Sequence, residues 1–309
     1  MRFSTVAAPL ALAGLVAAAP APANKGLNAR NNNGKYDDAT ILQYALTLEH
    51  LERAFYRDSL NQLGADAFQA AGLSDYVRYR FTEIANHEAN HVDFLSTALS
   101  AAGATPVKEC KYAFGIDSVA TFIATSQLLE EVGVSAYLGA APAIQSKAYL
   151  AVAGSILVVE AEHGAWALSA TDNMDAFPRP YAAPLDFNQV YSLAAPFITS
   201  CPSDNVALPF KPFPSITVNT EGPYKTGQTI NITVPKGLSG KVYAAFVSAT
   251  DTKFTQISNS GSSDVKIPEG LGGQNYLILT SGPAITDKAT VAGPAIIEIP
   301  VEAQNFEYK

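Results

Sequence analysis

The sequence is poor in cysteine, in charged residues and in long hydrophobic runs, and each shortage excludes a class of protein. Only 16% of its 309 residues are charged, and 20 basic against 28 acidic residues give a net charge of −8. Acidic chains bind nucleic acid and anionic membrane surfaces poorly, so neither is expected as a partner. The two cysteines, Cys110 and Cys201, predict one disulfide in a secreted chain, with two buried free thiols as the alternative.

The hydrophobic runs predict secretion and no membrane anchor. Residues 1–23, MRFSTVAAPLALAGLVAAAPAPA, have one Arg, an apolar run too short to span a bilayer, and small residues of A-x-A type. They predict a signal peptide and an extracellular protein. The apolar stretch 148–170 is interrupted by acidic residues, and the C-terminus lacks the hydrophobic tail of a lipid-anchor signal. The sequon at Asn231 predicts glycosylation, which requires surface exposure.

The chain changes its hydrophobic period part-way along. After a polar segment expected to be flexible, 24–36, four long stretches repeat apolar residues at helical spacing, which predicts a four-helix bundle over 37–201. These stretches are 37–60, 73–103, 117–138 and 148–170. A stiff Pro-rich linker, 202–214, follows. Short β-branched runs then alternate with period 2, so 215–309 is expected to be a small all-β, sandwich-like domain. The region has no Cys–Trp–Cys pattern, and an immunoglobulin assignment is not justified.

The expected helices carry polar side chains on their apolar faces. In the last of them, Glu160, Glu162 and His163 interrupt a run of Ala, Val and Leu. Burying an unpaired charge costs several kcal/mol, so this stretch needs a compensating partner.

A repeated pattern indicates what the partner is. In two of the helices a Glu precedes a Tyr by seven residues on the same face, and each is followed by a helix with a Glu-x-x-His pair one turn apart. The residues are Glu49 with Tyr56, Glu88 with His91, Glu130 with Tyr137, and Glu160 with His163. The bundle is therefore predicted to be a two-fold repeat of a Glu helix and a Glu-x-x-His helix.

This pattern resembles the ferritin-like superfamily of dimetal-carboxylate bundles. More narrowly, residues 37–201 resemble the secreted ferritin-like domain family that includes desiccation-related and fungal stress-response proteins. The resemblance does not extend to the β region. It implies six metal ligands in this chain, namely Glu49, Glu88, His91, Glu130, Glu160 and His163. Four carboxylates and two divalent cations would neutralise each other, and the oxygen and nitrogen ligands suit iron or manganese first and zinc next. The alternative is a metal-free bundle with paired buried carboxylates.

Several neighbouring residues are harder to assign. Glu52 shares the face of Glu49 and is expected to be a second-sphere or alternative ligand, because its counterpart in the repeat is Gly133. Tyr56 and Tyr137 are expected either to hydrogen-bond ligand carboxylates across the bundle or to be ordinary core residues. The side chains off the faces are expected to be solvated or at the rim; they are His50, Glu83, His87, Glu131 and Glu162.

Two functions of different classes follow from these features. The resemblance implies a centre that handles dioxygen or peroxide, hence an oxidoreductase of peroxidase, catalase or oxidase type in stress protection. The alternative is a non-catalytic extracellular structural or binding protein with a vestigial or structural metal site, whose β domain binds cell-wall material or a protein. A homodimer is compatible with either. An iron-storing cage is disfavoured, because a C-terminal domain of this size would disturb its packing.

The repeat also predicts topology. If equivalent halves run alike, the third helix starts at the same end of the bundle as the first. The ferritin pattern that the chain resembles instead requires a crossover along the length of the bundle. About thirteen residues join the second and third helices, and they reach about 40 Å when extended, enough for either arrangement. A Cys110–Cys201 bridge would pin this connection and close a loop of about 90 residues, which contributes about 4 kcal/mol in the chain-entropy model.

Overall fold

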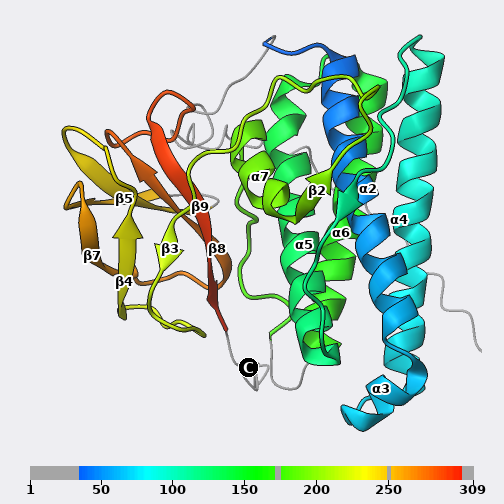
Figure 1. Ribbon diagram of the computed structural model, residues 1–309, viewed down its shortest axis with the longest axis horizontal. Helices are drawn as coiled ribbons and strands as arrows, with labels where there is room; N and C mark the ends of the chain where they lie inside the picture. The colour runs from blue at the N-terminus through cyan, green and yellow to red at the C-terminus, as the bar shows by residue number, and fades with distance from the viewer. Residues whose placement is uncertain (1–34, 171–174, 249–251, 301–309) are drawn as a thin grey trace, which may run out of the picture.

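A computed structural model describes residues 35–170, 175–248 and 252–300 of the chain. Helices fill its N-terminal part and antiparallel strands its C-terminal part, as the sequence predicts (Figure 1). The predicted signal peptide and most of the segment 24–36 lie outside the described residues. In the described part of the chain, no helix is both long enough and apolar enough to cross a membrane.

Four long helices form the bundle, and hydrogen-bonding side chains fix where two of them begin. Asp37 accepts a hydrogen bond from the Thr40 amide at the first helix, and Ser118 and Thr121 form a capping box at the third. The long helices are α2 (Asp38–Gln62), α4 (Asp75–Ala101), α5 (Val119–Ala140) and α6 (Lys147–Ala170). Two short helices, α3 (Ala65–Ala70) and α7 (Phe187–Ala194), and the 3-10 turns Ala141–Ala143 and Ala195–Phe197 complete the helical part.

The connection between α4 and α5 runs along the length of α2. Near the start of α2, the side chain of Gln43 donates to Thr105 O at 2.7 Å and accepts from the Val107 amide at 2.8 Å. At the end of α2, Gln62 donates to Ile116 O at 2.9 Å. The connection is therefore a crossover rather than a hairpin, and Figure 1 shows it descending beside α2.

Because of this crossover, α5 begins at the end of the bundle opposite to the start of α2. The carboxylate of Asp38, at the start of α2, accepts from the amides of Gln145 and Ser146, just beyond the end of α5. The crossover that the ferritin-like resemblance implies is present, and the expectation that the two halves run in the same direction is wrong. They are instead antiparallel, so the repeat relates them by a two-fold axis across the bundle.

A disulfide joins the crossover to the far end of the helical part, between Cys110 and Cys201, whose Cα atoms are 4.2 Å apart. It lies beside the small sheet formed by β1 (Lys111–Tyr112) and β2 (Ile198–Ser200). The predicted bridge is present, and it closes a loop with a sequence separation of 91.

Two antiparallel sheets face each other in the C-terminal part. The three-stranded sheet has the order β3 (Thr217–Val218), β4 (Thr229–Val234), β7 (Gly261–Lys266). The four-stranded sheet has the order β6 (Thr252–Ile257), β5 (Val242–Val247), β8 (Gly273–Thr280), β9 (Thr290–Ile299). Alternate residues such as Ile230 and Ile232 on β4, and Ala244 and Phe246 on β5, fill the space between the sheets.

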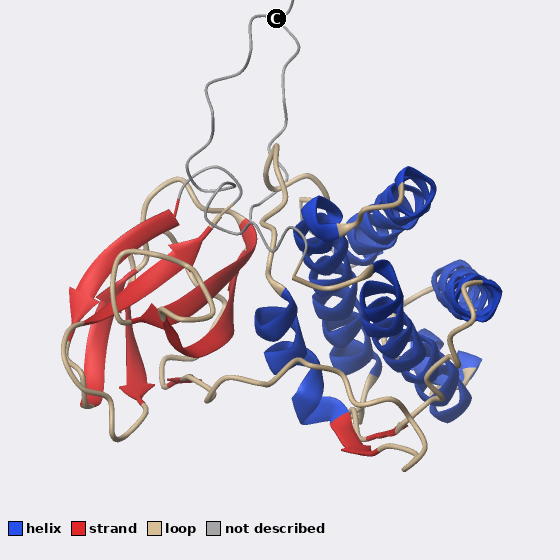
Figure 2. Cartoon of the chain, turned by 90° about the horizontal axis from the view of Figure 1, so that it is seen from above, coloured by secondary structure: helices blue, strands red, loops and turns tan. Residues whose placement is uncertain are grey.

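The other face of the four-stranded sheet packs on the helices, with α7 between α5 and β9 (Figures 1 and 2). Ala245, Tyr276 and Ile278 belong to the same buried cluster as residues of the long helices. The Tyr276 hydroxyl lies 2.8 Å from Ser135 Oγ of α5. All eight residues of β8 are buried, since both faces of the sheet are covered. The helical and β regions therefore share one core.

The Pro-rich segment 202–214 is anchored on the helices. Phe210 is only 4% exposed, and its ring lies 5.1 Å from that of Phe187 and 5.2 Å from that of Tyr44. The predicted limits of the linker and of the two domains stay predictions.

Candidate metal centre

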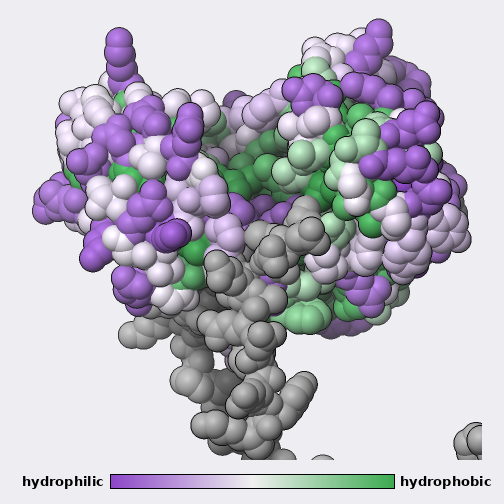
Figure 3. Space-filling model, turned by 90° about the horizontal axis from the view of Figure 1, so that it is seen from below, coloured by the Kyte–Doolittle hydropathy of each residue, from purple (hydrophilic) through white to green (hydrophobic). Residues whose placement is uncertain are grey.

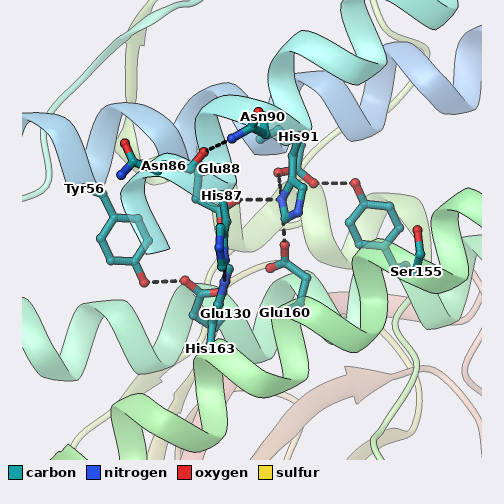
Figure 4. A network of polar contacts seen from close by, with 12 residues as sticks. Tyr56, Asn86, His87, Glu88, Asn90, His91, Glu130, Ser155, Glu160 and His163 are labelled. Atoms are coloured by element: carbon teal, nitrogen blue, oxygen red, sulfur yellow. Dashed lines mark hydrogen bonds and ion pairs between the residues drawn. The ribbon is translucent and has the colours of Figure 1, made fainter. Parts of the chain in front are cut away.

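Each long helix contributes at least one buried polar side chain to the middle of the bundle, and these side chains point toward one another (Figure 4). The four carboxylates predicted as ligands are all 0% exposed, and His163 is 5% exposed. They come from α2 (Glu49), α4 (Glu88), α5 (Glu130) and α6 (Glu160 and His163). The His91 side chain, also from α4, is 12% exposed.

The cluster contains two overlapping groups, each with ligand atoms within 4.8 Å of one another. One group is Glu49, Glu88, His91 and Glu160, and the other is Glu88, Glu130, Glu160 and His163. Glu88 has one carboxylate oxygen 3.1 Å from His91 Nδ1 and the other 3.0 Å from His163 Nδ1. Glu88 and Glu160 thus belong to both groups. The arrangement suits two ions held by shared carboxylates, each with a Glu and a His of its own.

Two tyrosines hold the unshared carboxylates from across the bundle. The Tyr56 hydroxyl donates to Glu130, and the Tyr137 hydroxyl donates to Glu49. Ser126, which the sequence reasoning did not single out, lies 2.6 Å from the Tyr56 hydroxyl. The pairing crosses between α2 and α5 because these helices are antiparallel. Such hydrogen bonds fix the orientation of a carboxylate before a metal arrives.

Burial and mutual repulsion disfavour the ionised form of the clustered carboxylates. Burial, and then the nearby carboxylates, raise the pKa of Glu160 well above its ordinary value. Burial also raises the pKa of Glu88 to about 7, although His163 and His91 oppose the shift. Burial alone would lower the pKa of His163, but Glu130 and Glu88 raise it to about 9. Without metal, protons on these groups neutralise the cluster.

Glu160 gives the most direct test of whether the cluster fits a metal. Neither of its carboxylate oxygens has a hydrogen-bond partner within the described part of the chain, and His91 Nδ1 is its ion-pair contact at 3.4 Å. A buried carboxylate left in this state costs several kcal/mol, so native proteins nearly always satisfy it. Divalent cations would satisfy it here, and the oxygen and nitrogen donor set is one that iron, manganese and zinc accept. The residues present fit a dimetal centre.

Glu52 is a fifth buried carboxylate beside the cluster, 4% exposed. It belongs to neither of the two groups, whereas Glu49 belongs to one. A Cβ built on Gly133 would lie 3.2 Å from Glu52 Oε1 and 2.4 Å from Glu160 Oε2. The missing side chain at position 133 therefore leaves room for the Glu52 and Glu160 carboxylates. Burial, and then Glu160, raise the pKa of Glu52 well above its usual value, which suits a neutral second-sphere acid.

Of the two histidines expected to be solvated, one is buried and the other is exposed but contacts a residue of the cluster. His50 is 6% exposed, and its Nε2 lies 3.0 Å from Val107 O, because the crossover covers the outer face of α2. His87 is exposed at one edge, but its Nδ1 lies 2.9 Å from His163 Nε2, with the two rings stacked. The sequence offered one sign that His87 lies near the cluster, which is its position one residue before Glu88 and one turn before His91.

The three remaining carboxylates lie outside the cluster. Glu162 is exposed and Glu83 is partly exposed, as expected. The Glu131 side chain is only 15% exposed, which corrects the expectation of a rim charge. It is paired with Arg179, which also donates to the backbone oxygen of Gln274 on β8, so this pair joins α5 to the sheet.

The glycosylation site predicted at Asn231 lies on β4 and is partly buried. Its side-chain amide donates to Asp264 at 2.7 Å. Its use as a glycosylation site stays a prediction.

Comparison with known proteins agrees with this geometry. Residues 37–173 match the sequence profile of the ferritin-like domain. The helical region is ferritin-like. The chain is also similar to Protein rds1 of Schizosaccharomyces pombe, with 28% identity over 181 residues, which cover 58% of this chain and 44% of that protein. The match therefore spans less than half the length of the relative. The role of the six ferritin-like positions as metal ligands stays a prediction.

Proposed function

We propose that the protein is a secreted ferritin-like dimetal protein that reacts with dioxygen or peroxide in stress protection. The observation that carries the proposal is the buried Glu160 carboxylate, shared by both ligand groups and without a hydrogen-bond donor among the described residues. The Cys110–Cys201 disulfide is compatible with an extracellular location.

Iron or manganese, with zinc as the third choice, would be held by Glu49 and His91 on one side and by Glu130 and His163 on the other. Glu88 and Glu160 would serve both ions. When bound, redox-active ions of this kind supply electrons to a small oxidant. Tyr137 and Tyr56 keep Glu49 and Glu130 oriented, and the surrounding side chains leave none of the four carboxylates exposed to solvent. Glu52 is placed to hold a proton next to Glu160.

The test is to load purified metal-free protein with Fe²⁺ under argon and to follow its oxidation by dioxygen and by hydrogen peroxide. We expect stoichiometric binding and faster oxidation than that of free Fe²⁺ under the same conditions. A Glu160→Gln variant keeps the shape of the side chain and should lose both properties, whereas Glu162→Gln, on the exposed face of α6, should keep both. Equal behaviour of the two variants would contradict the proposal.

A non-catalytic binding protein is the second candidate, and one surface favours it. A cavity of about 420 Å³ lies between α6 and residues 176–182. Phe177 and Tyr181 beside it are 82% and 63% exposed. Figure 3 shows hydrophobic residues gathered where the molecule is hollowed between its two regions. If the protein binds no metal in the test above, this surface becomes the place to look for a function.

A further inference from the structure

The two ends of the metal cluster differ in packing. Beyond Tyr56, the bundle is closed by a layer of aromatic rings, in which Phe55, Phe81 and Phe122 are 0% exposed. The ring of Phe122 lies 4.8 Å from that of Phe81 and 5.4 Å from that of Phe55. The short helix α3 adds Phe68 to this layer, 5.9 Å from Phe122. Such close packing leaves no opening for a small molecule at this end of the bundle.

Beyond Tyr137, at the other end, the bundle contains a cavity. Ala45, Leu95 and Ile156 line it, and each lies one helical turn from a residue of the Glu49, His91 and Glu160 group. Tyr137 itself lines the cavity and donates to Glu49. The cavity is therefore the next layer of the bundle, directly beside one half of the cluster.

The lining of the cavity offers little to a polar molecule. Nearly all of it is aliphatic or aromatic. The Asp38 carboxylate at its edge already accepts from two backbone amides, at 2.8 Å each, and the Tyr137 hydroxyl is committed to Glu49. Apolar cavities of this kind stay free of water. The ring of Phe94, which is 43% exposed, also lines the cavity, so the cavity reaches the surface.

Size narrows the choice of occupant. The cavity volume is about 30 Å³. This is the volume open to the centre of a water-sized sphere, so a molecule as small as a diatomic gas fits. Hydrogen peroxide is of similar size, but each of its hydroxyl groups would give up its hydrogen bonds to water, at a cost of about 1–3 kcal/mol per group. Dioxygen has no such bonds to lose.

We propose that this cavity is where dioxygen, rather than peroxide, is held and passed to the metal cluster. The assignment rests on the proposed function, because it takes the cluster to be the place where an oxidant reacts. It goes further in choosing the oxidant and the side from which it arrives.

Xenon tests the cavity without any reaction. It is apolar, and it binds dry apolar cavities. Crystals of the full chain under xenon pressure should show a xenon atom between Ala45, Leu95 and Ala153, a further lining residue on α6. Ala153→Leu fills the space from a partly exposed position and should abolish the peak, and Ala45→Leu provides a second variant from the opposite wall. Ala151→Leu, on the exposed face of α6, is the matched control and should keep it.

Kinetics test the choice of oxidant. In Fe²⁺-loaded protein, Ala153→Leu should slow oxidation by dioxygen about tenfold, while oxidation by hydrogen peroxide changes less than about twofold. Ala151→Leu should alter neither rate. The absence of xenon from the wild-type cavity, or equal effects of Ala153→Leu on both oxidants, would overturn the proposal. If the wild-type protein binds no iron, or oxidises it with neither oxidant, the proposed function fails, and the xenon experiment alone decides whether the cavity takes an apolar gas.

Discussion

Gly133 offers a way to disturb the cluster without disturbing the fold. It lies in the interior of α5, where a Cβ would come within 2.4 Å of Glu160 Oε2. An ordinary contact begins at 3.4 Å, so in a Gly133→Ala variant the carboxylate must move by about 1 Å. The clashing atom is the end of a flexible side chain, so the backbone can stay in place. The same substitution favours the helix by about 1 kcal/mol.

The expected result is a separation of stability from metal binding. Ligand distances tolerate only about 0.2 Å, so a displacement of about 1 Å removes Glu160 from both ion positions. We expect the affinity for Mn²⁺ to fall by at least about 100-fold, the upper end of what losing an outer-shell partner costs. The melting temperature of the metal-free protein should stay the same or rise.

Isothermal titration with Mn²⁺ and thermal unfolding followed by circular dichroism measure the two quantities. Gly154→Ala is the control, because a Cβ on Gly154 of α6 meets nothing within 4 Å. Gly154→Ala should raise the free energy of unfolding by about the same helix-propensity gain as Gly133→Ala, and it should leave Mn²⁺ binding unchanged. If Gly133→Ala bound Mn²⁺ as tightly as Gly154→Ala, then Glu160 would not be a ligand and the reasoning would be refuted.

Three further predictions concern the surroundings of the cluster. His87→Leu should weaken binding of one Mn²⁺ by about 10- to 100-fold by removing the partner of His163 Nε2, whereas His87→Asn retains an acceptor and should restore much of the affinity; identical titrations for the two variants would contradict this. Metal-free protein should lose stability as pH rises, because the folded form keeps protons that the unfolded chain has lost: on Glu88 between its ordinary pKa of 4.5 and about 7, and on His163 between 6.5 and about 9. Urea unfolding at several pH values measures this trend, and a free energy of unfolding that rises from pH 5 to pH 9 would contradict the prediction. Reducing the Cys110–Cys201 disulfide should lower the free energy of unfolding by about 4 kcal/mol. Because the helices and the sheet share one core, calorimetry should show a single unfolding transition at a lower temperature, and two separate transitions would contradict the shared core.

Periodicity was sufficient to predict the class of each region. The helical spacing of apolar residues predicts the four long helices, and the pairs Glu88–His91 and Glu160–His163 fall on their inner faces because three residues make nearly one turn. The repeat also placed Tyr56 and Tyr137 on the inner faces, but it did not decide between a hydrogen bond to a carboxylate and an ordinary core position, which the structure decides. These features are local in the sequence, and helix geometry alone converts them into positions.

Features set by tertiary packing could not be predicted in the same way. A repeat does not state whether its halves are parallel or antiparallel, and here the crossover along α2 decides it. The same crossover buries His50, which helix periodicity places on the outside. The pairing of Glu131 with Arg179 depends on how the sheet docks on α5, a contact between segments far apart in the chain. His87 is exposed as predicted, but its contact with His163 could not be predicted, because His163 lies on another helix.

The metal content of the full-length protein tests the central claim most directly. Protein purified from its natural host, or refolded and saturated with Mn²⁺ and then freed of excess metal, should contain about two first-row ions per chain by elemental analysis. The Glu160→Gln variant prepared alongside should contain fewer than one. Protein that holds no metal in either preparation, with the Glu160 carboxylate protonated and hydrogen-bonded to its neighbours in a high-resolution structure, would contradict the account.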